Sequence, residues 1–273
     1  MSPSPVAKGK QRGYLMPIGG AEDKGNNPRI LSRFLEICGG EKARIMIIPT
    51  ASRLPDTGSL YADLFLDLGA ERALFTEIHE RSDCDDELLL DEMDNATGIF
   101  VTGGNQLRLS GILGGTPVGQ RLRRLNAEGI PIGGTSAGAA MMSQHMIAGG
   151  RSGLSPREDG VNLAPGIGLT NTLIIDQHFS QRDRLGRLLT ALSYNPFLIG
   201  VGIDEDTAFL LDADDCGEVV GSGSVTILDA SQLSHSSRSQ ANQGEAISLV
   251  NMRLHVLTDG CTYNLESREA IIN

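Results

Sequence analysis

Short apolar runs alternate with longer amphipathic runs through the first two hundred residues, and this alternation limits the fold more than any other feature. Buried strands are predicted at residues 14–18, 44–48, 72–78, 98–101, 130–132 and 173–176. Helices are predicted at 28–38, 60–68, 85–93, 122–128, 137–142 and 180–194. Strands and helices that alternate in this way form a mostly parallel sheet with helices on both faces. The sequence therefore predicts an α/β fold.

The pattern changes after about Phe197. Short strands joined by polar turns are predicted at 201–211, 218–221, 225–228, 246–250 and 253–258, and the segment 231–245, rich in Ser, Gln and Asn, is predicted to be an exposed loop. We expect these strands to form an antiparallel extension of the same domain and not a separate unit. The 273 residues suit one large domain. We therefore predict a disordered tail over 1–12 and a single α/β domain over 13–273.

The composition argues against several classes of partner. Lys plus Arg number 23 against 34 for Asp plus Glu, a net charge of −11, and no basic stripe stands out. Nucleic acid and anionic membranes are therefore not expected as partners. No secretory signal or membrane-spanning apolar run is visible, and four scattered cysteines lack a CxxC pairing. We expect a cytoplasmic protein with reduced thiols and without a metal or cofactor.

The segment Gly134-Thr135-Ser136-Ala137-Gly138 fits the pattern G-x-S-x-G. It lies between the predicted strand 130–132 and the predicted helix 137–142. This is the context of a nucleophile elbow, in which a serine occupies a strained turn and small neighbours avoid a clash. The predicted helix would also favour negative charge at its N-terminus. A glycine-rich turn without chemistry is the alternative from the motif alone.

A serine nucleophile needs a base, and His178 has the most suitable context of the five histidines. It follows the predicted strand 173–176, and ligand and catalytic groups gather at the carboxyl ends of parallel strands. His145 would lie about 13 Å from Ser136 along a continuous helix. Of the remaining histidines, His79 precedes the acidic run 80–87, and His235 and His255 belong to the C-terminal strands and loops.

A carboxylate should orient the histidine, and three follow one another at Asp204, Glu205 and Asp206. In an extended strand Glu205 faces away from the other two, but periodicity does not say which face meets His178. An acidic turn without a role is the alternative. The order of serine, histidine and carboxylate also differs from that of α/β-hydrolases.

Two further segments are candidates for substrate contacts. The glycines in 101–106 could bring a backbone N–H group of Gly104 close to a substrate oxygen and, with Ala137, form an oxyanion hole. An ordinary turn is the alternative. Three arginines, Arg182, Arg184 and Arg187, follow His178 on the predicted helix 180–194. Surface solubility is the simplest account of these arginines.

The chain resembles the cyanophycinases, serine peptidases related to aspartyl dipeptidases with a class I glutamine-amidotransferase-like fold. Six segments in order, spread over nearly the whole chain, carry the resemblance. They are 18–24 (IGGAEDK), 102–109 (TGGNQLRL), 134–140 (GTSAGAA), 145–150 (HMIAGG), 176–179 (DQHF) and 202–207 (GIDEDT). Asn105 departs from the family pattern, in which an acid is common, and this affects the expected substrate contacts only.

The resemblance implies hydrolysis of cyanophycin, a polyaspartate backbone with arginine on each β-carboxyl, to β-Asp-Arg dipeptides. It assigns the nucleophile to Ser136, the base to His178 and the acid to Glu205. The substrate-binding positions of the family fall on Gln106, Asp176, Gln177, Arg182, Arg184 and Arg187. Arginines would bind substrate carboxylates and Asp176 a substrate guanidinium. The expected partners are the polymer, its products and a second copy of the chain in a homodimer.

Two alternatives remain at this stage. An α-aspartyl dipeptidase would use the same three side chains on a smaller substrate, and the three arginines and the long C-terminal region favour the polymer instead. A binding module would keep the fold without the chemistry, and the complete set of nucleophile, base and acid argues against it.

Overall fold

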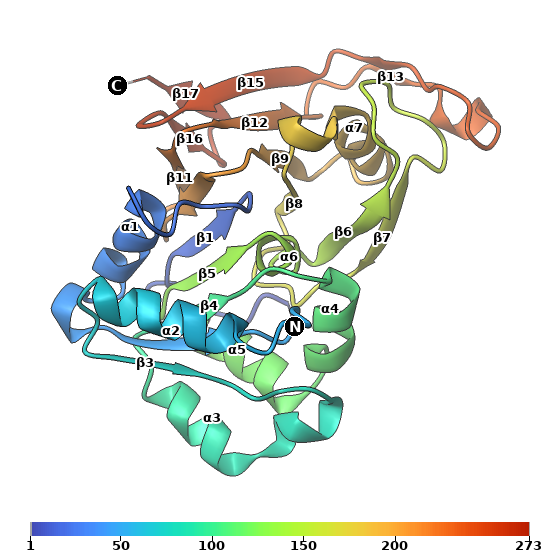
Figure 1. Cartoon of the computed structure of the whole chain (residues 1–273). Coiled ribbons are helices and arrows are strands. Elements are labelled where there is room, and N and C mark those ends of the chain that lie inside the picture. The colour runs from blue at the N-terminus through green and yellow to red at the C-terminus, as the bar shows by residue number, and fades with distance from the viewer. Residues whose placement is uncertain (1, 273) are drawn as a thin grey trace.

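The computed structural model describes residues 2–272 and contains a central sheet of nine strands (Figure 1). Five neighbouring strands are parallel, β1, β5, β4, β2 and β3, and the other four extend the sheet in antiparallel fashion. The predicted α/β class with an antiparallel C-terminal extension is confirmed. In spatial order the strands are β17 (Glu269–Ile271), β16 (Thr262–Asn264), β11 (Cys216–Gly221), β10 (Thr207–Leu211), β1 (Leu15–Ile18), β5 (Ile132–Thr135), β4 (Gly98–Val101), β2 (Arg44–Ile48) and β3 (Arg72–Phe75).

Helices cover both faces of the central sheet because its strands carry apolar side chains on both faces. Along β2, Ile45 and Ile47 pack with α1 (Arg29–Ile37) and α2 (Thr57–Asp67). Met46 and Ile48 point to the opposite face, as alternation along a strand requires. That face is covered by α3 (Glu87–Asp94), α4 (Gln106–Leu113), α5 (Pro117–Ala127) and α6 (Ala137–Ala140).

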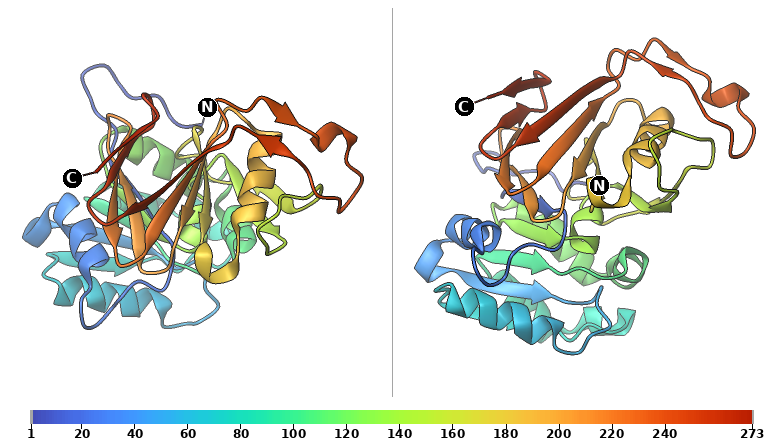
Figure 2. Two further views of the ribbon diagram at one scale, coloured as in Figure 1. Left: turned by 90° about the horizontal axis from the view of Figure 1, so that it is seen from above. Right: turned by 45° about the horizontal axis from the view of Figure 1, so that its top comes forward.

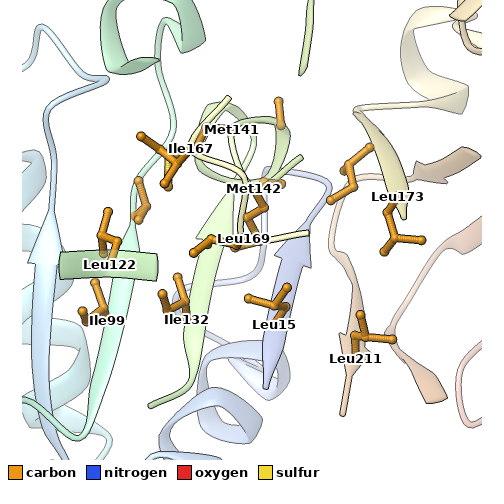
Figure 3. Close-up of a cluster of buried hydrophobic side chains, with 14 of the residues drawn as sticks. Leu15, Ile99, Leu122, Ile132, Met141, Met142, Ile167, Leu169, Leu173 and Leu211 are labelled. Carbon is orange, nitrogen blue, oxygen red and sulfur yellow. The ribbon is translucent and has the colours of Figure 1, made fainter. Parts of the chain in front are cut away.

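A second sheet of four strands packs beside these helices on the same face of the central sheet. Figure 3 shows Leu173 of the second sheet in one apolar cluster with Leu15 of the central sheet. The other face of the second sheet is covered by α7 (Leu185–Tyr194). Figure 2 shows the C-terminal strands gathered on the side away from α2. The strands in order are β15 (Arg253–Thr258), β12 (Ser224–Asp229), β9 (Ile199–Ile203) and β8 (Leu173–Gln177).

Several predicted elements are placed differently. The run 201–211 is two strands, β9 and β10, in different sheets, because Asp204–Asp206 interrupt it. The helix predicted at 180–194 is a short η3 (Ser180–Arg182) followed by α7, because Asp183 adopts a left-handed conformation. Among the elements that were not predicted are α4, the hairpin β6 (His145–Gly150) and β7 (Val161–Pro165), and the strands β16 and β17.

The remaining elements are short. They are η1 (Gly40–Lys42), η2 (Arg81–Asp85), η4 (Arg238–Gln240), β13 (His235–Ser236) and β14 (Leu249–Val250). The segment predicted to be an exposed loop, 231–245, therefore contains β13 and η4, and most of its residues are exposed or partly exposed.

The N-terminal segment 2–14 contains no helix or strand. Ser2 Oγ donates a hydrogen bond of 2.8 Å to the carbonyl of Gly168, and Arg12 Nη1 donates one of 3.2 Å to Asn126 Oδ1. The division into tail and domain stays a prediction. Within residues 2–272, no helix combines the length and the apolar character needed to cross a membrane.

Candidate active site

Ser136 lies in a tight turn between β5 and α6. Its backbone has φ 52° and ψ −107°, a conformation rare for a residue with a side chain. Its N–H donates to the carbonyl of Ile18, at 3.0 Å, which fixes the turn against β1. A Cβ atom at Gly138 would lie 2.2 Å from the carbonyl oxygen of Val101, so the turn needs glycine there. This is the strand, turn and helix arrangement of a nucleophile elbow.

The strand before the turn and the helix after it differ in detail from the sequence prediction. Strand β5 ends at Thr135, so Ser136 follows it directly. Helix α6 is a single turn, Ala137–Ala140. Any stabilisation of negative charge here therefore comes from the local N–H groups and not from the dipole of a long helix.

His178 reaches Ser136 from the second sheet. It follows β8 directly, and its Nε2 lies 2.9 Å from Ser136 Oγ. Its N–H donates to the carbonyl of Gly19, at 2.8 Å, which anchors the turn to the end of β1. A Cβ atom at Gly20 would lie 2.3 Å from His178 Cε1. The pair Gly19-Gly20 therefore leaves the space that the imidazole occupies.

Of the three carboxylates that the residue pattern left open, Glu205 contacts the other ring nitrogen of His178. His178 Nδ1 lies 2.6 Å from Glu205 Oε1. Gln177 of β8 pairs with Ile203 of β9, so the two segments leave the second sheet side by side. Asp204 instead accepts from Ser180 N, at 2.9 Å, and from the hydroxyl of Ser224.

The third carboxylate of the run, Asp206, also has its own partners. It accepts hydrogen bonds from Asp23 N, at 2.9 Å, and from Ser222 Oγ, at 2.6 Å. Both aspartates therefore hold loops together, and only Glu205 faces the imidazole.

Burial lowers the pKa of His178 below its usual value of 6.5. The hydrogen bond to Glu205 acts in the opposite direction and raises this pKa, whereas the positive charges of Arg182 and Arg184 lower it. The imidazole is therefore neutral at neutral pH, which is the state that accepts a proton from a serine hydroxyl. Glu205 fixes the tautomer by accepting a hydrogen bond from the protonated Nδ1, so the free electron pair of Nε2 faces Ser136.

The loop after β4 lies beside the nucleophile. A Cβ atom at Gly103 would lie 3.2 Å from Ser136 Cβ. Gly104 has φ 146°, a conformation that glycine favours, and its N–H donates no hydrogen bond to any residue in 2–272. Ala137, the first residue of α6, has an N–H without an intrahelical partner. Both residues have the free donors expected of an oxyanion hole.

The three arginines differ in their surroundings. Arg182 is exposed in η3. Arg187 is 6% exposed and donates through Nε and Nη2 to both carboxylate oxygens of Asp176, which is itself 1% exposed. Arg184, 8% exposed, donates to Gln177 Oε1 at 2.9 Å and to Asp176 at 3.4 Å. The description of all three as exposed surface charges is therefore wrong for Arg184 and Arg187.

Asp176, which the resemblance assigns to binding a substrate guanidinium, is surrounded by arginines of the protein itself. Its carboxylate already pairs with Arg187 and Arg184 beneath the surface. It lies within the protein and holds the arginines in place. The side chain of Gln177 likewise orients Arg184.

Gln106 and Asn105 begin α4 beside the glycine loop. Gln106 Nε2 donates to the carbonyl of Ala148, at 2.9 Å, and so connects α4 to β6. Its Oε1 accepts no hydrogen bond from the residues that the structure describes. Asn105 Oδ1 accepts from Arg108 N, at 3.0 Å, and caps the helix. An aspartate would cap equally well, so the departure from the family pattern leaves this role intact.

Glu22 is a buried residue whose role the sequence reasoning missed. Its carboxylate accepts from Thr135 Oγ1, at 2.6 Å, and from the hydroxyl of Tyr61. Lys24 Nζ lies 3.1 Å from the same group. Glu22 therefore fixes the residue before the nucleophile. Its signal was its position in the segment 18–24, which carried part of the resemblance.

Within residues 2–272, no group of three or more His, Cys, Asp and Glu side chains is arranged to hold a metal ion. The four cysteines are unpaired, with Cys38 and Cys84 buried. The arrangement of hydroxyl, imidazole and carboxylate is suited to nucleophilic acyl transfer.

Comparisons with known proteins agree with this geometry. The model of "Peptidase family S51" matches residues 15–219. A cyanophycinase of Synechococcus elongatus is 44% identical over 260 residues, which cover 94% of this chain and 81% of the relative. A cyanophycinase of Geminocystis herdmanii is 42% identical over 260 residues, with coverages of 94% and 96%.

Among solved structures, a peptidase from an acI-B1 Actinobacterium has a TM-score of 0.65 at 21% identity, covering 96% of this chain and 98% of that chain. A putative peptidase E protein from Listeria monocytogenes has a TM-score of 0.52 at 17% identity, with coverages of 77% and 98%. These two similarities concern the fold. Together with the family match and the identity to curated relatives, they lead to one conclusion: the chain belongs to peptidase family S51, whose members are serine-type peptidases.

Proposed function

We propose that this chain is a cyanophycinase, an exopeptidase that hydrolyses cyanophycin to β-Asp-Arg dipeptides through an acyl-enzyme on Ser136. The observation that carries the proposal is the continuous chain of hydrogen bonds from Ser136 Oγ to His178 and from His178 to Glu205. The 42% and 44% identity to proteins named cyanophycinase supports the choice of substrate.

The proposed reaction proceeds in two acyl transfers. His178 Nε2 accepts the proton of Ser136 Oγ as the oxygen attacks the backbone carbonyl of an aspartyl residue. Glu205 stabilises the imidazolium that forms, and the N–H groups of Gly104 and Ala137 donate to the oxyanion. The imidazolium then gives its proton to the departing amine. A water molecule, deprotonated by the same imidazole, attacks the ester carbonyl, and the imidazolium returns the proton to Ser136 Oγ as the C–O bond breaks and the acid product leaves.

The proposed substrate contacts follow from the hydrogen-bonding groups of each side chain that have no partner within residues 2–272. Arg182 is exposed, so its guanidinium can bind a substrate carboxylate in bidentate fashion. Gln106 offers Oε1 to an N–H group of the substrate. Asp176 and Gln177 contribute by orienting Arg184 and Arg187. No metal or cofactor takes part in the proposed reaction.

The test is incubation with purified cyanophycin and mass analysis of the products. Wild-type protein should release β-Asp-Arg. The variant Ser136→Ala should lose several orders of magnitude in rate, because the hydroxyl supplies the covalent step, and keep its thermal unfolding curve. A fluorophosphonate probe should label the wild type at Ser136.

Each other outcome of this test has a defined meaning. Turnover retained by Ser136→Ala would exclude the serine mechanism. Release of product only from α-aspartyl dipeptides would reassign the enzyme to that activity, and an absence of both labelling and turnover would indicate a binding module.

We place the proposed enzyme in the cytoplasm, as a homodimer. The unpaired cysteines are compatible with a reducing compartment. Light scattering coupled to gel filtration tests the homodimer.

A further inference from the structure

A cavity of about 600 Å³ lies at the carboxyl ends of β2 and β3, beside the candidate active site. The segments that follow the two strands line it, together with Arg108 of α4, and Ser136, His178 and Glu205 do not. Arg108 donates to the carbonyls of Thr50, at 3.0 Å, and His79, at 3.2 Å, and so holds the two segments at a fixed separation. A cavity of this size is typical of ligand sites.

The glycine loop, Gly103 and Gly104, lies between this cavity and Ser136. Gly103 lies against Ser136, as described above, and a Cβ atom at Gly104 would lie 2.1 Å from the carbonyl oxygen of Ala51. Ser52, which lines the cavity, follows Ala51 in the chain, and its backbone N would lie 2.8 Å from a Cβ atom at Gly104. A chain bound across Ser136 therefore needs to pass over two glycines to enter the cavity.

Two buried hydroxyl groups of the cavity lining lack partners. Thr50 and Thr76 are each 3% exposed, and the Oγ1 of each forms no hydrogen bond with any residue in 2–272. Buried polar groups in proteins are nearly always hydrogen-bonded, because an unpaired one loses its interactions with water and gains nothing. Both Oγ1 atoms are covered by the protein and not open to the cavity, so a ligand can hydrogen-bond to them only after the Thr50 or Thr76 side chain rotates about its Cα–Cβ bond.

The cavity also has two opposite charges that are not paired. Arg53 and Glu77 line it, and neither side chain forms a hydrogen bond or ion pair within the described part of the chain. Glu77 also borders a neighbouring cavity that contains Asp83 and Asp86. Leu54, 73% exposed, and the exposed ring of Phe75 add an apolar wall. The lining therefore suits a ligand with a cationic end, an anionic end and an apolar stem.

We propose that this cavity is a distal subsite that binds the β-linked arginine of a cyanophycin repeat remote from the scissile bond. That arginine carries a guanidinium for Glu77, a free carboxylate for Arg53 and methylene groups for Leu54 and Phe75. The isopeptide link offers an N–H and a carbonyl group to the hydroxyls of Thr50 and Thr76 once these side chains rotate toward the cavity. The proposal rests on the proposed function, since it takes cyanophycin as the substrate.

The order of the strands sets which repeat reaches the distal subsite. The strands β5, β4, β2 and β3 are neighbours in this order. At about 4.8 Å per strand, the ends of β2 and β3 lie about 10–15 Å from that of β5. An extended chain covers about 3.3–3.6 Å per residue, so the subsite serves a repeat about three or four residues from the scissile bond. A dimer of β-Asp-Arg is too short to reach it, whereas a pentamer reaches it.

The test compares kcat/KM for the β-Asp-Arg pentamer with that for the dimer. The ratio should fall about tenfold in Arg53→Ala, because a charge-assisted hydrogen bond to the carboxylate is lost. It should also fall in Glu77→Gln and in Thr76→Val. Thr76→Val should keep or raise the melting temperature, since the hydroxyl has no partner in the protein.

The matched controls are Lys42→Ala and Glu41→Gln. These exposed residues precede β2 and so lie at the opposite edge of the sheet. Lys42→Ala removes one positive charge, as Arg53→Ala does, and Glu41→Gln removes one negative charge, as Glu77→Gln does. Neither control should alter the ratio. If the controls lower it as much as Arg53→Ala and Glu77→Gln do, the effect is one of net charge and the distal subsite is excluded.

A binding measurement separates failure of the subsite from failure of the proposed function. Pentamer binding to Ser136→Ala is compared by calorimetry with binding to Ser136→Ala/Arg53→Ala. Equal affinities, or an unchanged kinetic ratio, would exclude the distal subsite even if cyanophycin is hydrolysed. Absence of hydrolysis in the wild type would instead contradict the proposed function, and a weaker affinity of the double variant would still support the subsite.

Discussion

At the scale of single residues, three adjacent carboxylates of the candidate site have different hydrogen-bond partners. Asp204 and Asp206 each accept hydrogen bonds from loop atoms, and Glu205 alone contacts His178. Glu205 and Asp206 lie in the turn between β9 and β10, where Asp206 has φ 48°, and the three side chains have different partners, so a neighbour cannot replace Glu205. The three positions therefore predict different consequences of substitution.

We expect Glu205→Gln to lower kcat by about 10²–10⁴-fold, because the imidazolium loses its negative partner. Asp204→Asn should lower kcat far less.

The dependence of activity on pH provides a second test of the same assignment. Activity requires neutral His178, so it declines as the pH falls through the lowered pKa of this residue. Glu205 raises that pKa, so Glu205→Gln should move the acid limb to lower pH.

Asp204→Asn is the control, because it should leave the acid limb in place. The measurement is kcat/KM of the wild type and both variants over the acid range. If Asp204→Asn impaired turnover more than Glu205→Gln, the triad acid would be the neighbouring residue.

At the scale of elements, the sequence predicted what depends on local pattern. Ser136 and His178 could be proposed from the sequence because each follows a predicted apolar strand. The choice of Glu205 over Asp204 came from the resemblance, since it depends on pairing between β8 and β9, which periodicity does not contain. The division of 201–211 into β9 and β10, which belong to different sheets, likewise depends on pairing with strands that are distant in the sequence. Hairpin β6–β7 was missed because its sequence includes Gly149 and Gly150 and much of it is only partly buried.

The ion pair between Arg187 of α7 and Asp176 of β8 connects a helix to the second sheet. The sequence indicated an exposed charge, because the burial of an arginine depends on a carboxylate from another element. We expect Arg187→Ala to lower the free energy of unfolding by about 3–5 kcal/mol, since Asp176 would keep a buried charge with only Arg184 to offset it.

Arg182→Ala is the matched control. Arg182 is exposed and has no side-chain partner within residues 2–272, so its loss should barely change the melting temperature. Thermal and urea unfolding of both variants provide the measurement. Equal stabilities would show that the pair between α7 and β8 contributes nothing to the fold.

At the scale of the whole molecule, the candidate site forms where two sheets meet. Ser136 comes from the central sheet, whereas His178 and Glu205 come from the second sheet. The contact runs through Gly19 and Gly20 at the end of β1. The distance between nucleophile and base therefore depends on how closely the sheets approach, and not on any single strand.

Gly20→Ala tests this dependence. The new methyl group would lie 2.3 Å from His178 Cε1 and 2.6 Å from Nε2, so the ring has to move away from Ser136. Gly20 also has φ 102°, which adds backbone strain to a residue with a side chain. We expect kcat to fall by about a hundredfold or more, because small misplacements of reacting groups are costly. Labelling of Ser136 by a fluorophosphonate should slow in parallel.

Gly111→Ala is the matched control for Gly20→Ala. Gly111 lies within α4, and a Cβ atom there would meet nothing within 4 Å. Alanine should therefore stabilise the helix by about 0.5–1 kcal/mol and leave turnover unchanged. Gly20→Ala should still unfold cooperatively, at a lower temperature than the wild type, since its φ of 102° strains the backbone while the clash falls on one side chain at the edge of the sheet. Wild-type turnover in a folded Gly20→Ala would mean that the imidazole of His178 can accommodate the added methyl group. The close approach of the two sheets would then not be what positions the base.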